Sequence, residues 1–453
     1  MTRRTFLAAA AAGVAPRPAR PNVLIILADD LGWADVGFHK SEIRTPNLDR
    51  LASEGVRFGR FYSFPLCSPT RSTLMTGRSP MRFGVAYHVI RPWLDYGVPA
   101  TEHFMSESFR AAGYQTAITG KWHLGHSRKA FMPNSRGFDH AYGHLNGNID
   151  YYTHEREGGL DWHRNGESIV EEGYSTDLMA AEAIRFIERR DRSRPFFVYL
   201  PFNAPHSPLQ APQDRIARYA SIQDKNRRVF AAMVDTMDDA IGRVLAALDR
   251  EGLRNDTIVL FFSDNGGPIG LGARNTPLRG AKGSVWEGGT RVPAVLRWPG
   301  KVKAGQTSQQ VISALDVFPT LAAAAGVRPA NKLPLDGVNL WPEISSGGRR
   351  TRENLLLAVE TGQFLQYALH HREWKLVREI PKQGGEPVNH LFRIEEDMEE
   401  KNDLAAKHPD VVKDLAARIE AWRPLYPPDG VRMAARQPDG WKAPAKWAEA
   451  ARR

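Results

Sequence analysis

Cys67 is the residue whose type and setting say most about chemistry, and it is the only cysteine in the 453-residue chain. Because it has no cysteine partner, it cannot form an internal disulfide bond. It is either a small buried hydrophobic residue or a residue retained for its reactivity. Ser68 and Pro69 look like the N-cap and first-turn pair of a helix. Free N–H groups and the helix dipole at such an end favour negative charge, so the setting indicates a reactive cysteine.

Hard oxygen ligands follow two apolar runs of the chain. Asp29 and Asp30 come directly after the first run, and Asp264 and Asn265 come shortly after another. Calcium takes about six to eight oxygen ligands, and carboxylates are common among them. A single Asp pair after a strand is more often a cap or a turn, so the metal interpretation depends on both pairs. Zinc is less favoured, because only one thiolate is present and the histidines lack a tight ligand spacing.

The elements that must position these residues form a repeating pattern of strands and helices. In an open α/β sheet, ligands bind outside the carboxyl ends of the strands, so polar groups that follow several strands should converge on one edge. The alternation predicts a doubly wound α/β domain. We expect strands at 22–28, 116–119, 195–200 and 257–262, and helices from Pro46 to Gly55 and at 101–112, 176–190 and about 226–250.

Four further residues are candidates for the site. Lys121 and His123 alternate after a strand and would both face the cleft if the backbone stayed extended there. His206 follows another strand, and Lys282 lies in the glycine-rich stretch 266–289. This stretch has the composition of an active-site loop, with a passive surface loop as the alternative. Taken singly, a histidine is usually structural and a lysine usually lies on the surface.

These segments resemble the signatures of the type I sulfatases of the alkaline phosphatase superfamily, over roughly residues 21–345. The resemblance rests on 66–78 (LCSPTRSTLMTGR), 113–125 (GYQTAITGKWHLG), 205–208 (PHSP) and 278–289 (LRGAKGSVWEGG). It implies an alkaline phosphatase-like α/β domain, with a central mostly parallel sheet flanked by helices, and a smaller α+β C-terminal domain with an antiparallel sheet. Thr70 stands where serine is commoner in the family.

The resemblance also implies two cofactors. In that family the cysteine, here Cys67, is oxidised by the formylglycine-generating enzyme to formylglycine, whose hydrate attacks sulfur. Asp264 would accept the proton of the attacking hydroxyl. The implied ligands of a calcium ion are Asp29, Asp30, residue 67 itself, Asp264 and Asn265.

The resemblance assigns the remaining steps, which are sulfate binding, protonation of the leaving group and release of sulfate, to particular residues. Arg71 and Lys121 would hold the hydrate and the sulfate oxygens. His206 or Lys282 would protonate the leaving alcohol, and the sequence leaves open which. His123 would remove a proton from the second hydroxyl, which expels sulfate. The implied catalytic set is Cys67, Arg71, Lys121, His123, His206 and Lys282.

The substrate is less clearly indicated. The stretches 150–155 (DYYTHE) and 275–289 look most like the arylsulfatase B branch, which removes the 4-sulfate of N-acetylgalactosamine in chondroitin and dermatan sulfates. Tyr151, Tyr152 and His154 could line a sugar site or could equally be core aromatics and a loop histidine. A sulfated glycan is the expected substrate. A phosphonate monoester or phosphodiester hydrolase, and a non-catalytic binder of sulfated glycans, are the alternatives.

The termini and the charge complete the picture. Residues 1–20 resemble a twin-arginine export signal, which predicts a periplasmic or extracellular protein, and their apolar stretch is too short for a stable membrane span. The catalytic domain is expected at 21–347 and a small C-terminal domain at 348–453, with a loose tail after Pro427. The net charge of +10 would suit a polyanion but is interpreted as solvated surface charge. No nucleic-acid-binding motif is recognised, so nucleic acid is not expected as a partner.

Overall fold

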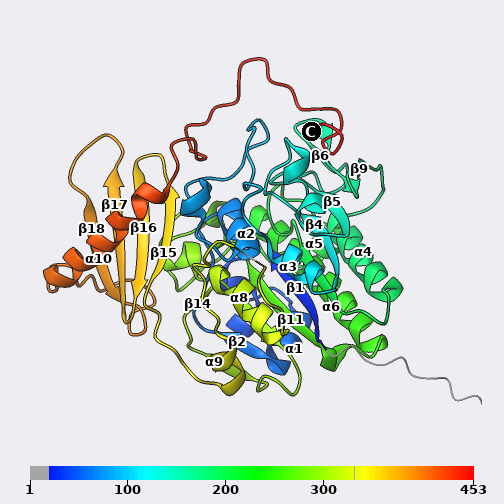
Figure 1. Ribbon diagram of the computed structural model, residues 1–453, viewed down its shortest axis with the longest axis horizontal. Coiled ribbons are helices and arrows are strands. Elements are labelled where there is room, and N and C mark those ends of the chain that lie inside the picture. Colours follow the sequence, from blue (N-terminus) through cyan, green and yellow to red (C-terminus); the bar gives the residue numbers. More distant parts are fainter. Residues whose placement is uncertain (1–19, 331, 453) are drawn as a thin grey trace, which may run out of the picture.

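The structure, a computed structural model, describes residues 20–452 except residue 331. The predicted export signal therefore lies outside the described residues, apart from Arg20. A large sheet forms the centre of the molecule, and a smaller antiparallel sheet stands beside it (Figure 1). Within the described part of the chain, no helix is both long and apolar enough to cross a membrane.

The central sheet has ten strands and is parallel in its middle. β1 lies between β10 and β11, and all three run parallel, as do β4 and β5 further along. Antiparallel pairs occur towards the edges. In spatial order the strands are β13 (Gln306–Ser308), β2 (Val56–Phe58), β12 (Ala294–Arg297), β11 (Thr257–Ser263), β1 (Asn22–Ala28), β10 (Phe196–Pro201), β4 (Gln115–Lys121), β5 (His140–His144), β8 (His163–Arg164) and β9 (Glu167–Ser168).

Both faces of this sheet are covered, which is why its middle strands are continuous apolar runs. Alternate residues of β1 enter two different cores, with Ile25 in one and Ile26 in the other. Residues of α2, α3 and α8 pack into the first core, and residues of α1, α4 and α6 into the second. The helices are α1 (Pro46–Glu54), α2 (Cys67–Thr76), α3 (Met105–Ala111), α4 (Ser175–Arg189), α5 (Gln213–Ala217), α6 (Lys225–Arg250), α7 (Glu287–Thr290), α8 (Ala314–Ala324) and α9 (Trp341–Ser346).

The C-terminal part contains a four-stranded antiparallel sheet and one long helix, as expected for its fold class. One face of the sheet packs against Tyr62, Phe64 and Trp286 of the larger part, and the other is covered by α10. Its elements are β15 (Leu355–Glu360), β16 (Phe364–His371), β17 (Trp374–Pro381), β18 (Val388–Arg393) and α10 (Pro409–Trp422). Two small sheets pair β3 (Phe61–Tyr62) with β14 (Ile312–Ser313) and β6 (Glu155–Arg156) with β7 (Gly159–Leu160).

Two expectations about the course of the chain differ from the structure, apart from those at the site described below. The helix expected at 101–112 is shorter, because Glu107 accepts a hydrogen bond from the Phe104 backbone and so begins α3 at Met105. The tail after Pro427 is not loose. It arches back from the small sheet over the larger part (Figure 1), where Trp447 is 2% exposed and stacks edge-on against His126.

Candidate active site

Residues that follow four parallel strands meet at one edge of the central sheet, as the topology predicts. The aspartates follow β1, Lys121 ends β4, His206 follows β10, and Asp264 follows β11. The N-terminal turn of α2 adds Cys67 and Arg71 to this edge. The distances below show that these side chains form one buried cluster.

Cys67 is the first residue of α2 and is 2% exposed. Its thiol donates to Asp29 Oδ1 over 3.5 Å. Leu66 takes the N-cap position, so Ser68 lies inside the helix, and its hydroxyl donates to the backbone oxygen of His123 instead of capping. Burial and the Asp29 carboxylate raise the pKa of the Cys67 thiol. The helix end therefore does not produce a thiolate here, and the unmodified side chain is a neutral thiol.

Each of the three buried carboxylates is paired with a buried or largely buried cation, so the cluster is close to neutral. The pairs are Lys121 Nζ with Asp29 Oδ2 at 2.6 Å, Arg71 Nη2 with Asp264 Oδ2 at 2.8 Å, and Lys282 Nζ with Asp30 Oδ1 at 2.6 Å.

The pKa values of Asp30 and Asp264 are shifted in opposite directions. Burial alone would raise the pKa of Asp30, but Lys282 and His206 outweigh it and lower the pKa to about 2. For Asp264, burial and the negative charge of Asp29 raise the pKa to about 6 against the opposing effect of Arg71. A carboxyl group with such a pKa can exchange a proton near neutral pH.

The donors fit a divalent cation. Asn265 Oδ1 is buried without a hydrogen-bond partner among the described residues, while its Nδ2 donates to Asp30 Oδ1 and to the Gly266 backbone oxygen. Ligand atoms of Asp29, Asp30, Cys67 and His206 lie within 4.8 Å of one another. A buried orphan oxygen beside carboxylates suits a hard cation better than zinc. His206 joins this group although the sequence predicted it only as catalytic.

The two histidines are fixed by backbone carbonyls. His123 has a φ of 58°, so the backbone is left-handed and not extended there, contrary to the expectation. Its Nε2 lies 3.0 Å from the Ile90 carbonyl, and its Nδ1 is buried without a partner among the described residues. His206 Nδ1 lies 2.7 Å from the Ser207 carbonyl. Burial, with Lys121 or Lys282 adding to it, lowers the pKa of His123 well below its usual value and that of His206 to about 3, so both rings are neutral.

The predicted sugar-site residues lie in different places. Tyr151 is 1% exposed, and its hydroxyl lies 2.7 Å from the backbone oxygens of Asn203 and of His206, which share its one proton. It therefore braces the segment that carries His206. His154 is also 1% exposed and stacks on Trp162. Of the three, only Tyr152 is exposed, at 46%, so burial argues against direct sugar contact by the other two.

The loop that carries Lys282 is anchored to the C-terminal sheet by buried charges. Lys375 on β17 lies 2.8 Å from both Glu287 Oε1 and Glu400 Oε1, and all three are at most 2% exposed. Glu287 also accepts a hydrogen bond from Tyr62 and faces Arg291. The sequence gives no sign of this cluster, because its members are far apart in the chain and no local spacing links them.

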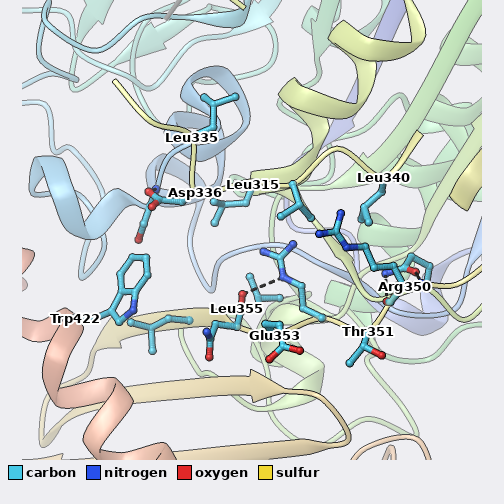
Figure 2. Close-up of a pocket in the computed structure, with 15 residues that line it drawn as sticks. Leu315, Leu335, Asp336, Leu340, Arg350, Thr351, Glu353, Leu355 and Trp422 are labelled. Carbon is cyan, nitrogen blue, oxygen red and sulfur yellow. Dashed lines mark hydrogen bonds between the residues drawn. The ribbon is translucent and has the colours of Figure 1, made fainter. Parts of the chain in front are cut away.

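A cavity of about 540 Å³ lies away from the cluster, along the seam between α8 and the C-terminal sheet. Figure 2 shows Trp422 and Asp336 at one end and Arg350 at the other, with Leu355 between them. One of its charged lining residues, Arg352, is paired with Asp316, which does not line the cavity. None of the predicted site residues lines it.

Comparisons with known proteins agree with this geometry. The Sulfatase family model matches residues 21–327. Arylsulfatase J of Mus musculus is 34% identical over 467 residues, which covers 91% of this chain and 78% of the relative. N-acetylgalactosamine-6-sulfatase of Homo sapiens is 36% identical over 403 residues, covering 82% and 75%. The crystal structure of Ps i-CgsB in complex with k-i-k-neocarrahexaose has a TM-score of 0.82 at 33% identity, covering 94% of this chain and 95% of that one.

The sheet topology and these matches define an alkaline phosphatase-like hydrolase. The chain belongs to the sulfatase family, and it is a sulfuric ester hydrolase. The predictions of family, fold class and enzyme class are thereby confirmed. The branch within the family, for which arylsulfatase B was expected, stays a prediction.

Proposed function

We propose that the protein removes sulfate from a sulfated glycan, using a formylglycine made from Cys67 and a bound calcium ion. The observation that carries this proposal is the position of Cys67, a neutral thiol at the centre of a cluster of carboxylates, lysines and histidines. A neutral thiol is a poor nucleophile. The cluster is therefore better explained by a side chain that is converted to another group.

The two added groups would supply complementary chemistry. A hydrated formylglycine would provide an oxygen nucleophile at position 67, and a calcium ion held by Asp29, Asp30, Asp264 and Asn265 would acidify and orient that oxygen. Asp264, whose carboxylate is held by Arg71, would accept the proton of that oxygen.

Arg71 and Lys121 would bind the sulfate oxygens. Both are fully buried, and each already donates to a carboxylate. Donors held in place before the substrate arrives stabilise developing charge without the cost of reorganisation. A bound sulfate ester carries one negative charge, so it would offset half of the charge that a divalent cation adds to the cluster.

His123 is arranged to act as a base through Nδ1. Because the Ile90 carbonyl can only accept a hydrogen bond, Nε2 carries the proton and Nδ1 keeps its lone pair. This tautomer matches the expected role of removing a proton from residue 67 to release sulfate.

Lys282 is the better candidate for protonating the leaving alcohol. Burial opposes its charge, but Asp30 raises its pKa above the ordinary value, so the ammonium group persists. His206 is neutral, and its Nδ1–H is directed at the Ser207 carbonyl. We therefore assign the acid to Lys282 and a hydrogen-bonding role on the leaving side to His206.

A sulfated galactosamine glycan of the chondroitin or dermatan type is our candidate substrate. Support comes from the relative that is an N-acetylgalactosamine-6-sulfatase and from the similar structure that binds k-i-k-neocarrahexaose. Tyr152 is exposed at 46%, so it would be accessible to a sugar outside the cluster. Whether the 4-sulfate or the 6-sulfate is removed is part of the test.

The test compares sulfate release from N-acetylgalactosamine 4-sulfate, N-acetylgalactosamine 6-sulfate and 4-nitrophenyl sulfate with hydrolysis of a phosphodiester and a phosphonate monoester. The proposal predicts release from at least one sugar sulfate, abolished by chelation and restored by calcium. Turnover of the phosphorus esters alone would favour the alternative hydrolase. Binding of sulfated glycans without release from any ester would favour a non-catalytic binder.

Three other expectations accompany this proposal. A formylglycine-generating enzyme acts on Cys67 during maturation. Export proceeds through the twin-arginine-like segment 1–20 to the periplasm or the exterior. The chain divides into a catalytic domain at 21–347 and a C-terminal domain at 348–453.

A further inference from the structure

Two arginines outside the predicted catalytic set lie next to the groups that fix the catalytic histidines. Arg91 directly follows Ile90, whose carbonyl accepts the hydrogen bond from His123 Nε2 over 3.0 Å. Arg156 lies at the end of β6, in the segment that follows the buried Tyr151. Both side chains are partly buried, and that of Arg156 is 22% exposed.

Arg156 is tied to the neighbourhood of His206 through one amide. Its guanidinium donates to Asn148 Oδ1. Asn148 Nδ2 in turn donates to the Ser207 carbonyl over 3.3 Å, which is the same carbonyl that His206 Nδ1 contacts at 2.7 Å. Arg156 is thus two hydrogen bonds away from the oxygen that orients His206.

The contacts of Arg91 leave its charge without a counter-ion. Its Nη2 lies 3.4 Å from His88 Nε2, but His88 Nδ1 accepts from the Val89 backbone, so Nε2 carries the proton and cannot accept. The guanidinium also lies 5.4 Å from the centre of the Trp93 ring. Among the residues that the structure describes, no carboxylate lies within salt-bridge distance of Arg91.

Arg156 has only a weak partner. Glu157, its neighbour in sequence, lies 2.9 Å away but is itself 40% exposed, and exposed pairs of this kind contribute little. The Nε atoms of both arginines are buried with no hydrogen-bond partner among the described residues. Burial lowers the pKa of Arg156 against the pull of Glu157 and Asp161, and the positive charge of Arg91 lowers it further. Both arginines also belong to segments that lie against the His123 ring: Arg91 follows Ile90, and Arg156 binds Asn148, whose neighbour Gly147 lies against that ring.

Two partly buried cations beside the same histidine, with no buried carboxylate of the described residues within salt-bridge distance, favour an anion beside them, because an anionic ligand would supply charge and hydrogen-bond acceptors. Arginine is suited to this, since its planar fork matches both sulfate and carboxylate. In the proposed mechanism, the sulfate group that is removed is already bound by Arg71 and Lys121. The anion at this second place must therefore be another charged group of the same substrate.

We propose that Arg91 and Arg156 form a second anion-binding subsite, which recognises a negatively charged group on the sugar next to the one that loses its sulfate. This proposal rests on the proposed glycan substrate. It assigns to the enzyme a preference for polyanionic oligosaccharides over monosaccharides that carry one sulfate. The group recognised is a sulfate ester or a uronic acid carboxylate.

The test measures kcat/KM of the wild type, Arg91→Gln and Arg156→Gln on three substrates. These are a monosulfated N-acetylgalactosamine, a disaccharide with the same sulfated sugar and a uronic acid, and a disaccharide with the same sulfated sugar and a second sulfate but no carboxylate. Arg250→Gln, on a side chain 60% exposed at the end of α6, is the matched control for loss of one positive charge. Arg91→Lys retains the positive charge but lacks the planar guanidinium group.

The ratio of kcat/KM between a disaccharide and the monosaccharide should fall about tenfold in each Gln variant, mainly through KM, because one charge-assisted contact is lost. In Arg91→Lys this ratio should fall less than in the Gln variants, and in Arg250→Gln it should equal that of the wild type. If the ratio falls only for the disaccharide with the uronic acid, the subsite binds a carboxylate. If it falls only for the disulfated disaccharide, the subsite binds a sulfate ester.

An unchanged ratio in both variants, or an equal loss on all three substrates, would overturn the subsite while leaving the proposed function intact. Wild-type enzyme that releases sulfate from none of the three sugars would overturn the glycan substrate and the subsite together.

Discussion

Replacing Lys375 by methionine should both destabilise the protein and disturb the active-site loop. Lys375 Nζ is shared by Glu287 and Glu400 at 2.8 Å each, and its side chain is fully buried between the two sheets. Glu287 is the first residue of α7, five positions after Lys282, and its backbone N–H donates to Glu400. Loss of the ammonium group leaves Glu400 without a cation and Glu287 with Arg291 alone.

The expected magnitude follows from two considerations. Removing one partner of a buried ion pair costs about 3–5 kcal/mol. Lys375 and Arg291 together overcome the effect of burial and lower the pKa of Glu287 from 4.5 to about 2, which corresponds to about 3 kcal/mol shared between the two cations. Because the folded-state pKa lies below the unfolded one, this stabilisation is present above about pH 4.5 and is lost as the pH falls towards 2.

The assay is denaturant unfolding at pH 7 and at several values down to pH 3, together with kcat and KM. Lys375→Met should lose about 3 kcal/mol or more at pH 7, and its stability should depend less on pH in the acid range than that of the wild type. Adding Glu400→Gln to this variant should restore part of the loss, because it removes the uncompensated carboxylate. Lys413→Met, at an exposed position of α10, is the control. A loss below about 1 kcal/mol at pH 7 would refute the reasoning.

Three other substitutions probe different parts of the structure. In Gly147→Ala the new Cβ would lie 2.7 Å from His123 Cε1, so kcat should fall at least about tenfold with little change in stability; Gly362→Ala, where a Cβ meets nothing within 4 Å, is the control, and equal activity of the two variants would contradict this. Lys282→Ala should lose more activity on a sugar sulfate than on 4-nitrophenyl sulfate, since a good leaving group needs no acid; an equal loss on both would remove Lys282 from that role. Trp447→Ala should cost about 3–5 kcal/mol in denaturant unfolding, because this tail residue is 2% exposed, whereas no loss would mean that the tail is held loosely.

The sequence predicts the central elements well where a pattern has a single physical explanation. The apolar run at 22–28 matches β1 residue for residue, and the periodic stretch from about Asn226 corresponds to α6. Convergence of the aspartates, Lys121 and His206 follows from parallel strands ending at one edge. These predictions needed only local pattern and topology.

The remaining features depend on contacts that no local pattern encodes. The left-handed backbone at His123 is invisible in the sequence, as is the Ile90 carbonyl that holds its ring. A tyrosine at position 151 looks the same in the sequence whether it braces a loop or lines a sugar site. Only the burial of its side chain in the structure separates the two roles. Arg156 directly follows the stretch 150–155, so its charge is a signal that the sequence does contain.

The identity of residue 67 in the mature protein tests the central claim most directly. Peptide mass spectrometry should be carried out on protein from a host that contains the formylglycine-generating enzyme, beside protein from a host that lacks it, with sulfate release measured on both. We predict an aldehyde in place of the thiol in the first sample, with calcium-dependent sulfate release in proportion to the conversion. Sulfate release of equal rate from protein with an unmodified Cys67 thiol, or full conversion without release from any sulfate ester, would contradict the account.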